Sequence, residues 1–274
     1  MEVAERFTRV DGLNTRYLEV GEGPEIVLLH GASLGSCANT WDRNLVPLAS
    51  FGFRVIAYDD PGYGLSDNPA EYTADYREVF LIKFLDALGF ASANVLGHSQ
   101  GGGVALYVVL KHPERFTKLM VLGPARVLPP LEGINPEVWE FGEELTREPT
   151  VEVTREMTKD HVFDESTITP EALEVRQRMS VGPCFEAYLW RRRAPRGPVG
   201  PPRRPLWQRL DEVSVPLLMV FGADDHRGYA SKRVPLLREK YPGLRIEVLD
   251  RCGHLMQWDA AGRLEELAAS FFGS

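Results

Sequence analysis

Long apolar runs are missing from this chain of 274 residues, and cysteine is scarce. No stretch approaches the roughly 18 apolar residues that a membrane-spanning helix needs, so we expect no membrane partner. Residues 1–6 lack the basic and then apolar segments of a secretory signal. The three cysteines lie far apart and form no C-x-x-C pair: Cys37, Cys184 and Cys252. We therefore expect free thiols, no metal site and a cytoplasmic protein.

An excess of positive charge is also missing. The net charge of −8 favours solubility and argues against nucleic acid as a partner. Hydrophobic residues make up 44% of the chain and charged residues 26%, which are ordinary values for a globular protein. A chain of this length is able to bury a large core, either as one α/β domain or as one domain with an insertion. The composition leaves a homo-oligomer open.

Short apolar runs alternate with segments of helical periodicity along most of the chain. Asp11-Gly12 separates two alternating segments and predicts an antiparallel hairpin, with strands at residues 7–10 and 16–20, at a sheet edge. Further strands are expected at 25–30, 53–58, 95–97, 117–122, 215–221 and 244–249, and helices at 40–50, 73–88, 104–111, 231–241 and 260–272. This alternation predicts an α/β fold with a mostly parallel sheet and helices on both faces.

The pattern changes after Gly123, where only helix signals appear up to about residue 193. A capping residue, a proline and an acid follow one another twice, and each time they mark a helix start. Four helices are expected in this block, from Asn135, over residues 150–160, from Thr169 and over residues 183–192. We interpret the block as a helical cap over the functional edge of the sheet, inserted after the sixth strand.

The cap divides the predicted core into two parts, residues 1–125 and 206–274, with the cap itself at 126–205. Its large side chains are candidates for a substrate pocket, although most are expected to pack the cap onto the core: Trp139, Phe141, Met157, Phe163, Met179, Phe185, Tyr188 and Trp190. The stretch Arg191–Pro205 holds six arginines and five prolines without an acid. Such a run suits an anion site, but without interleaved aromatics we interpret it as a solvated linker back to the sheet.

One glycine-rich turn carries the strongest chemical signal. Gly97-His98-Ser99-Gln100-Gly101 follows a short apolar strand and precedes a helical run. A G-x-S-x-G sequence between a strand and a helix is the pattern of a nucleophile elbow, in which the serine sits on a sharp turn and the glycines leave room for the crossing backbone. The helix N-terminus places free N–H groups beside any negative charge that develops there. Ser99 is therefore the candidate nucleophile.

A serine nucleophile needs a base, and the base needs an orienting acid. Of the six histidines, His254 alone sits in a loop just after a late core strand, at the edge where strand ends gather. His30, before a glycine loop, is expected to shape that loop. Asp224 and Asp225 are the candidate acids, with Asp250 as a third that is expected to serve a turn. The order Ser, Asp, His describes a catalytic triad, and such chemistry requires no cofactor.

The chain resembles the α/β hydrolases over nearly its whole length. The motifs that carry the resemblance are His30-Gly31, Asp60-Pro61-Gly62-Tyr63-Gly64-Leu65-Ser66, Gly97-His98-Ser99-Gln100-Gly101, Gly222-Ala223-Asp224-Asp225 and Gly253-His254. The G-x-x-D pattern of that family implies Asp225 as the acid. The resemblance also implies that the backbone N–H groups of Ala32 and Gln100 form the oxyanion hole.

Within this superfamily, the segment from Arg251 to Trp258 and the helical insertion are similar to the meta-cleavage-product hydrolases. The resemblance implies hydrolysis of a carbon–carbon bond in a 2-hydroxy-6-oxo-dienoate. That group has asparagine before the nucleophile and tryptophan after the catalytic histidine, where this chain has His98 and Leu255. It also uses a cap arginine to bind the substrate carboxylate, for which this chain offers three candidates by region: Arg176, Arg178 and Arg191.

The expected partner is a small carbonyl compound. Residues expected to contact it lie in the oxyanion loop, next to the triad and in the cap: Ser33, His98, Trp139, Trp190 and Leu255. Two alternatives to carbon–carbon hydrolysis stay open, a carboxylesterase or lactonase, and a ligand-binding protein built on a hydrolase scaffold. An aspartate nucleophile would indicate haloalkane dehalogenase or epoxide hydrolase chemistry, which Ser99 argues against.

Overall fold

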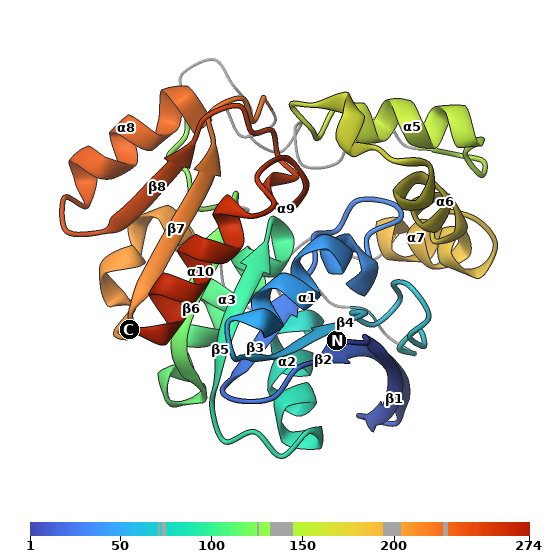
Figure 1. The fold of residues 1–274 in the computed structure, drawn as a ribbon, viewed down its shortest axis with the longest axis horizontal. Helices are drawn as coiled ribbons and strands as arrows, with labels where there is room; N and C mark the ends of the chain where they lie inside the picture. The colour runs from blue at the N-terminus through green and yellow to red at the C-terminus, as the bar shows by residue number, and fades with distance from the viewer. Residues whose placement is uncertain (71, 73–74, 125, 132–144, 194–203, 227–229) are drawn as a thin grey trace.

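The fold is built on one sheet of 8 strands, whose order is β1-β2-β4-β3-β5-β6-β7-β8 (Figure 1). The computed structural model describes residues 1–70, 72, 75–124, 126–131, 145–193, 204–226 and 230–274. Only β2 runs against the direction of the other strands, since β1 and β4 both pair with it antiparallel. The strands are β1 (Ala4–Val10), β2 (Leu13–Val20), β3 (Glu25–Leu29), β4 (Arg54–Tyr58), β5 (Ala93–His98), β6 (Phe116–Leu122), β7 (Leu217–Gly222) and β8 (Arg245–Leu249).

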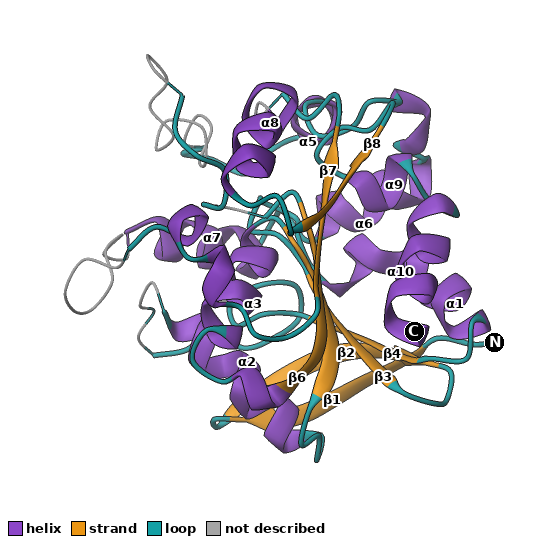
Figure 2. Cartoon of the chain, turned by 90° about the vertical axis from the view of Figure 1, so that its left-hand side faces the viewer, coloured by secondary structure: helices purple, strands orange, loops and turns teal. Residues whose placement is uncertain are grey.

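Helices cover both faces of this sheet (Figure 2). One face carries α2 (Tyr76–Ala87), α3 (Gln100–Val109) and α8 (Ala230–Lys240), and the other carries α1 (Asp42–Ser50) and α10 (Arg263–Gly273), with α9 (Met256–Asp259) before it. Single turns of 3-10 helix lie at Ala38–Trp41, Pro113–Arg115, Glu165–Thr167, Leu206–Gln208 and Leu210–Glu212. The α/β fold with a mostly parallel sheet is thus confirmed.

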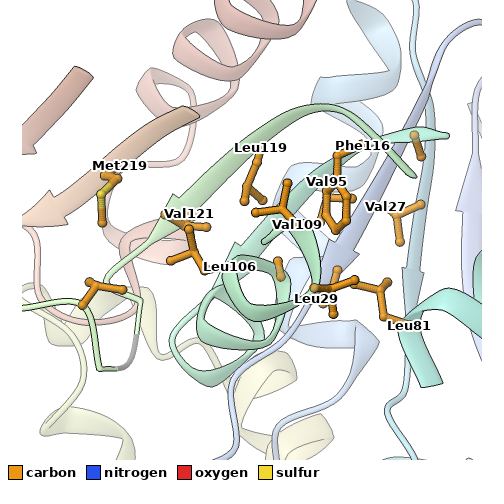
Figure 3. Close-up of a cluster of buried hydrophobic side chains, with 14 of the residues drawn as sticks. Val27, Leu29, Leu81, Val95, Leu106, Val109, Phe116, Leu119, Val121 and Met219 are labelled. Carbon is orange, nitrogen blue, oxygen red and sulfur yellow. The ribbon is translucent and has the colours of Figure 1, made fainter. Parts of the chain in front are cut away.

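Successive residues of the central strands pack on opposite faces and so divide the core in two. In β3, Val27 and Leu29 join the cluster under α2 and α3, whereas Ile26 and Leu28 join the cluster under α1 and α10. All four side chains are fully buried. Figure 3 shows part of the first cluster, where side chains of the strands meet Leu81 and Leu106 from the two helices. This burial on both faces explains why the strands are continuous apolar runs.

Helical segments that the sequence predicted after the sixth strand are present as α5 (Val151–Lys159), α6 (Pro170–Arg178) and α7 (Pro183–Arg193). Helix α6 begins at the expected cap, since the Thr169 side chain accepts a hydrogen bond from the N–H group of Ala172. Thr150, at the start of the helix expected over 150–160, caps α5 in the same way and accepts from the N–H group of Val153. Figure 1 shows these helices gathered beyond the carboxyl ends of the central strands. The expected helix from Asn135 and the linker after residue 193 lie outside the described residues.

Two boundaries differ from the sequence prediction. Helix α3 begins at Gln100 rather than at Val104, so it contains the three glycines that a propensity argument leaves out. The C-terminal helical segment, expected as one helix over 260–272, is divided into α9 and α10. Gly262 lies between them with φ +90°, a conformation that breaks the helix. Among the described residues, no helix combines the length and the apolar character needed to cross a bilayer.

The crossing of β5 and α3 brings two stretches of backbone close together near the strand ends. A methyl group on Gly97 would lie 2.7 Å from the Cα of Gly102, and one on Gly101 would lie 2.5 Å from the carbonyl oxygen of His30. The methyl group on Gly97 would meet backbone atoms of Gly101 and Gly102, and the one on Gly101 would meet the backbone carbonyls of His30 and Leu29. A change of side-chain rotamer cannot relieve a clash with backbone atoms. Only glycine therefore fits at these two positions.

We expect Gly101→Ala to lower the free energy of unfolding by about 1–3 kcal/mol, because the added methyl group forces strand and helix apart. Gly243→Ala is the matched control, since nothing lies within 4 Å of a methyl group there. Urea unfolding of both variants measures the difference. A Gly101→Ala protein as stable as the Gly243→Ala protein would contradict the packing described here.

Candidate active site

Ser99 stands at the turn between β5 and α3 in a strained conformation. Its φ of 54° and ψ of −120° lie in a region that residues with a side chain rarely adopt, at a cost on the order of 1–3 kcal/mol. Its N–H donates to the carbonyl of Leu122 over 2.8 Å, which ties the turn to the end of β6. The serine expected as nucleophile therefore lies at the carboxyl edge of the sheet, as the elbow pattern predicts.

His254 and Asp225 meet at the same edge. His254 follows β8 and Asp225 follows β7, and the His254 Nδ1 lies 2.8 Å from Oδ2 of Asp225. The carboxylate is buried, with 4% of Asp225 exposed. A carboxylate accepts only, so Nδ1 carries the proton and Nε2 has the lone pair that a base needs.

The other two candidate acids are placed elsewhere. Asp224 is half-buried, and its N–H donates to the carbonyl of Cys252 over 2.9 Å. Asp250 is exposed in a turn, where its carbonyl accepts a contact from the Cys252 thiol. The geometry thus distinguishes Asp225 from both, a choice that residue spacing alone left open.

Two links bring the elbow and the histidine together. Nε2 of His98 donates to the His254 carbonyl over 2.9 Å, and the two rings lie 4.8 Å apart by their centroids. On the other side, Gly123 directly follows Leu122, whose carbonyl accepts the hydrogen bond from the Ser99 N–H. A methyl group on Gly123 would lie 3.4 Å from both Asp225 Oδ2 and His254 Nδ1. The residues expected as base and acid therefore lie beside the elbow that carries Ser99.

His30 shapes the loop that is expected to supply an oxyanion donor. Its Nδ1 donates to the carbonyl of Gly31 over 2.6 Å, and its Nε2 accepts from the N–H of Asp60 over 3.1 Å. Burial lowers the pKa of His30, against the opposing effect of the Asp60 carboxylate. The neutral ring suits these two bonds, because protonated Nε2 would no longer accept from the Asp60 N–H. Ala32 continues this loop, and Gln100 opens α3 beside Ser99.

His98 presents a ring nitrogen for which the described residues offer no hydrogen-bond partner. Only 3% of His98 is exposed, and its Nδ1 makes no such bond. Burial and then the charge of His254 lower the pKa of His98 well below its usual value, so the ring is neutral. With Nε2 donating, Nδ1 is an acceptor. It faces Gly31, since a methyl group there would lie 3.3 Å from this atom.

Three cap arginines were candidates for a substrate carboxylate, and the structure separates them. Arg176 on α6 is buried, and its Nη2 donates to the hydroxyl of Ser33 in the oxyanion loop over 2.9 Å. Arg178 is exposed to solvent. The guanidinium of Arg191 lies over the ring of Tyr63, 3.6 Å from its centroid. Arg176 is thus the candidate in contact with the site loop.

The remaining expected contact residues are scattered. Trp190 packs edge-on against Tyr72, with ring centroids 5.6 Å apart, so it joins cap and core. Leu255 is buried, and its N–H donates to the carbonyl of His161 over 2.7 Å. Trp139 lies outside the described residues. Among the residues the structure does describe, no three His, Cys, Asp or Glu side chains group in a way that could hold a metal ion.

His161 is a neighbour of the site that sequence reasoning did not select. Its ring lies 5.8 Å from that of His254, and its Nδ1 donates to the Met157 carbonyl over 2.7 Å. The loop after α5 therefore runs directly over the residue expected to act as base. Sequence spacing held no signal for this contact, because the two histidines lie on segments that only the position of the cap brings together.

Comparisons with known proteins agree with this architecture. Residues 24–142 match the model of the family described as alpha/beta hydrolase fold. A 2-hydroxy-6-oxononadienedioate/2-hydroxy-6-oxononatrienedioate hydrolase of Burkholderia vietnamiensis is 33% identical, over 94% of this chain and 91% of the relative. A 2-hydroxy-6-oxo-6-phenylhexa-2,4-dienoate hydrolase of Comamonas testosteroni is 31% identical, over 93% of this chain and 90% of the relative.

A solved structure of the same group superposes on nearly the whole chain. It is the meta-cleavage product hydrolase from Pseudomonas fluorescens, 27% identical, with a TM-score of 0.78 over 98% of this chain and 97% of that one. The aligned regions cover nearly the whole of both chains in each of these three comparisons. The chain is therefore a hydrolase that belongs to the α/β-hydrolase family, in its group of meta-cleavage-product hydrolases.

Proposed function

We propose that the chain hydrolyses a carbon–carbon bond in a 2-hydroxy-6-oxo-dienoate, with Ser99 as nucleophile, His254 as base and Asp225 as its orienting acid. The observation that carries this proposal is the bond of 2.8 Å between His254 Nδ1 and Asp225, next to a serine on a strained elbow. The relatives named for dienoate hydrolysis supply the substrate class.

The chemistry follows from the arrangement of these groups. Ser99 Oγ attacks the ketone carbonyl carbon while His254 Nε2 takes its proton. The N–H groups of Ala32 and Gln100 bind the negative oxygen that forms, and donors of this kind contribute about 3 kcal/mol each. Cleavage requires that the proton of the 2-hydroxyl group first moves to C5, so that the C2 oxygen becomes a carbonyl. The C5–C6 bond then breaks, its electron pair passes into a dienolate conjugated with this carbonyl, and the fragment gains a proton and leaves as a 2-hydroxydienoate. Water next hydrolyses the acyl-enzyme and restores the serine.

The acidic end of such a substrate carries a carboxylate beside a hydroxyl group. Arg176, through its place against Ser33, supports a site for the carboxylate at the cap side of the oxyanion loop. The acceptor Nδ1 of His98 suits the neighbouring hydroxyl, which donates a hydrogen bond. Trp190, which packs against Tyr72, and Leu255, which directly follows His254, stay candidates for contact with the rest of the substrate.

A carboxylesterase or lactonase is the second candidate. The observation that favours it is the presence of His98 and Leu255 at the two positions where the meta-cleavage-product hydrolases have asparagine and tryptophan. The same triad and oxyanion donors serve ester hydrolysis, so the two functions differ only in the leaving group.

We expect wild-type protein to bleach the yellow chromophore of a 2-hydroxy-6-oxo-dienoate, and Ser99→Ala to slow this reaction by at least about 10³-fold. A fluorophosphonate should label the wild-type protein and leave Ser99→Ala unlabelled. Cleavage of p-nitrophenyl esters without any loss of dienoate colour would favour the esterase. Full labelling of Ser99→Ala would remove Ser99 as the nucleophile.

Asp225→Asn should reduce kcat by about 10⁴-fold, because an amide no longer holds the tautomer of His254 that accepts the serine proton. Asp224→Asn is the matched control, one residue away and bonded through its backbone to Cys252. We expect its kcat to stay within about threefold of the wild type. Steady-state kinetics on one ester and one dienoate measure both variants. Equal losses in the two would refute the choice of Asp225.

Arg176→Met should raise KM for the dienoate by about 10- to 100-fold, because hydrogen bonds to charged groups contribute about 1.5–3 kcal/mol. For p-nitrophenyl acetate, which has no carboxylate, we expect KM to change by less than about threefold. Arg178→Met, on the same helix but exposed, serves as control. If Arg176→Met raises KM for both substrates by the same factor, the arginine acts on the fold and not on the carboxylate.

A further inference from the structure

Arg77 lies on α2, beneath the site, and contacts both segments expected to supply oxyanion donors. Its Nη2 donates to the His30 carbonyl over 3.1 Å, and its Nη1 donates to Oε1 of Gln100 over 3.3 Å. Nη2 also pairs with the carboxylate of Asp60. The side chain is buried, with 3% of Arg77 exposed. One guanidinium thus connects the loop after β3, the loop after β4 and the start of α3.

The pairing with Asp60 keeps the guanidinium charged and in place. Burial opposes the charge, but the Asp60 carboxylate, together with Tyr63 and Tyr72, outweighs this effect and raises the pKa of Arg77 above its ordinary value. The ring of Tyr63 lies under the guanidinium, 5.4 Å from its carbon to the ring centroid. A planar group with fixed donor directions, held on several sides, can set the position of the groups it bonds.

His30 connects Arg77 to the first oxyanion donor, the Ala32 N–H. Asp60 donates its N–H to His30 Nε2, and His30 Nδ1 donates to the Gly31 carbonyl. The Gly31 carbonyl and the Ala32 N–H belong to one planar trans peptide and point in opposite directions. The bond to the Gly31 carbonyl therefore determines where the Ala32 N–H points.

The side chain of Gln100 connects Arg77 to the second oxyanion donor, the Gln100 N–H. Its Oε1 accepts from Arg77, while its backbone N–H is the one that follows the nucleophile. A side chain anchored at its end limits rotation at the first residue of a helix, where the N–H has no partner within the helix. Arg77 is the group shared by the two paths.

We propose that Arg77 is a positioning residue that aligns the two oxyanion donors, Ala32 N–H and Gln100 N–H. The inference rests on the proposed function, because it assumes that these N–H groups stabilise a transition state. Arg77 does not need to touch the substrate for this role. The expected signature is a loss in kcat with an unchanged KM, since alignment of an oxyanion hole matters only once the negative oxygen forms.

Arg16 offers a matched control for the structural cost of removing a buried arginine. It too is 3% exposed, and its Nη1 pairs with the carboxylate of Asp59 over 3.2 Å. Asp59 directly precedes Asp60 in the chain, yet the side-chain hydrogen bonds of Arg16 lead to Glu5, Asn39 and Asp59 and, among the described residues, to neither oxyanion segment. A purely structural role for Arg77 would make the two arginines equivalent.

The test compares Arg77→Met with Arg16→Met on p-nitrophenyl acetate, on a dienoate and with phenylboronic acid, which forms a tetrahedral adduct at a serine. For Arg77→Met we expect kcat to fall about 10- to 100-fold, KM to stay within about twofold and boronate inhibition to weaken by the same factor as kcat. For Arg16→Met we expect a similar drop in melting temperature, with kcat within about threefold. Equal kcat values for the two variants would overturn the proposal.

Two further variants keep the test decisive if Arg77→Met does not fold. Gln100→Met removes only the side-chain acceptor and should lower kcat about threefold to tenfold, with boronate affinity falling in parallel. Arg77→Lys keeps the charge near Asp60 but lacks the fork of donors, so it should recover stability without recovering kcat. An unchanged kcat in Gln100→Met, or full activity in Arg77→Lys, would refute the proposal.

The proposed function can fail separately from this inference. A wild-type protein that hydrolyses neither ester nor dienoate would end the proposed function. If the wild-type protein hydrolyses an ester alone, the kcat values of the Arg77 and Arg16 variants can still be compared on that ester, because ester hydrolysis passes through the same kind of negative oxygen.

Discussion

The close approach of β5 to α3 is the constraint on which the rest of the site depends. Because neither Gly97 nor Gly102 has a side chain, their backbones come close enough for the chain to turn sharply and hold Ser99 at φ 54°. The turn is fixed from outside by the Leu122 carbonyl and by the His30 carbonyl that packs on Gly101. The strain at one residue is therefore balanced by contacts from β3 and β6, and the proposed nucleophile stands where the ends of these strands meet.

Much of this arrangement could be predicted from the sequence, because its signals are local. The elbow, the Asp-Gly hairpin and the strands buried on both faces each follow from a short run of residues. The order of Ser99, Asp225 and His254 relative to the strands places them at one edge, since parallel strands share the direction of their ends. Both Asp224 and Asp225 lie just after β7, so their position in the sequence alone left the choice open. The resemblance implied Asp225, and it is the Asp225 carboxylate that bonds to His254.

The parts that could not be predicted depend on contacts between distant segments. Arg77 belongs to a helix whose apolar spacing says nothing about the loops it supports, and its contact with His30 spans 47 residues. Arg178 lies two residues from Arg176 and carries the same charge, and only the burial of Arg176 against Ser33 distinguishes the two. The helix α3 was expected to begin later because glycine is a weak helix former, whereas here close packing outweighs that preference.

The bond between the Leu255 N–H and the His161 carbonyl has a consequence for protein engineering. Cap segments are the natural part to exchange between relatives when a new substrate is wanted, since the core carries the chemistry. In this chain, however, the segment after α5 also supports the residue next to His254, and a methyl group on Gly253 would lie 2.8 Å from the His161 carbonyl oxygen. A transplanted cap therefore has to reproduce the path of residues 161–163, or the exchange will alter the rate of reaction together with the choice of substrate.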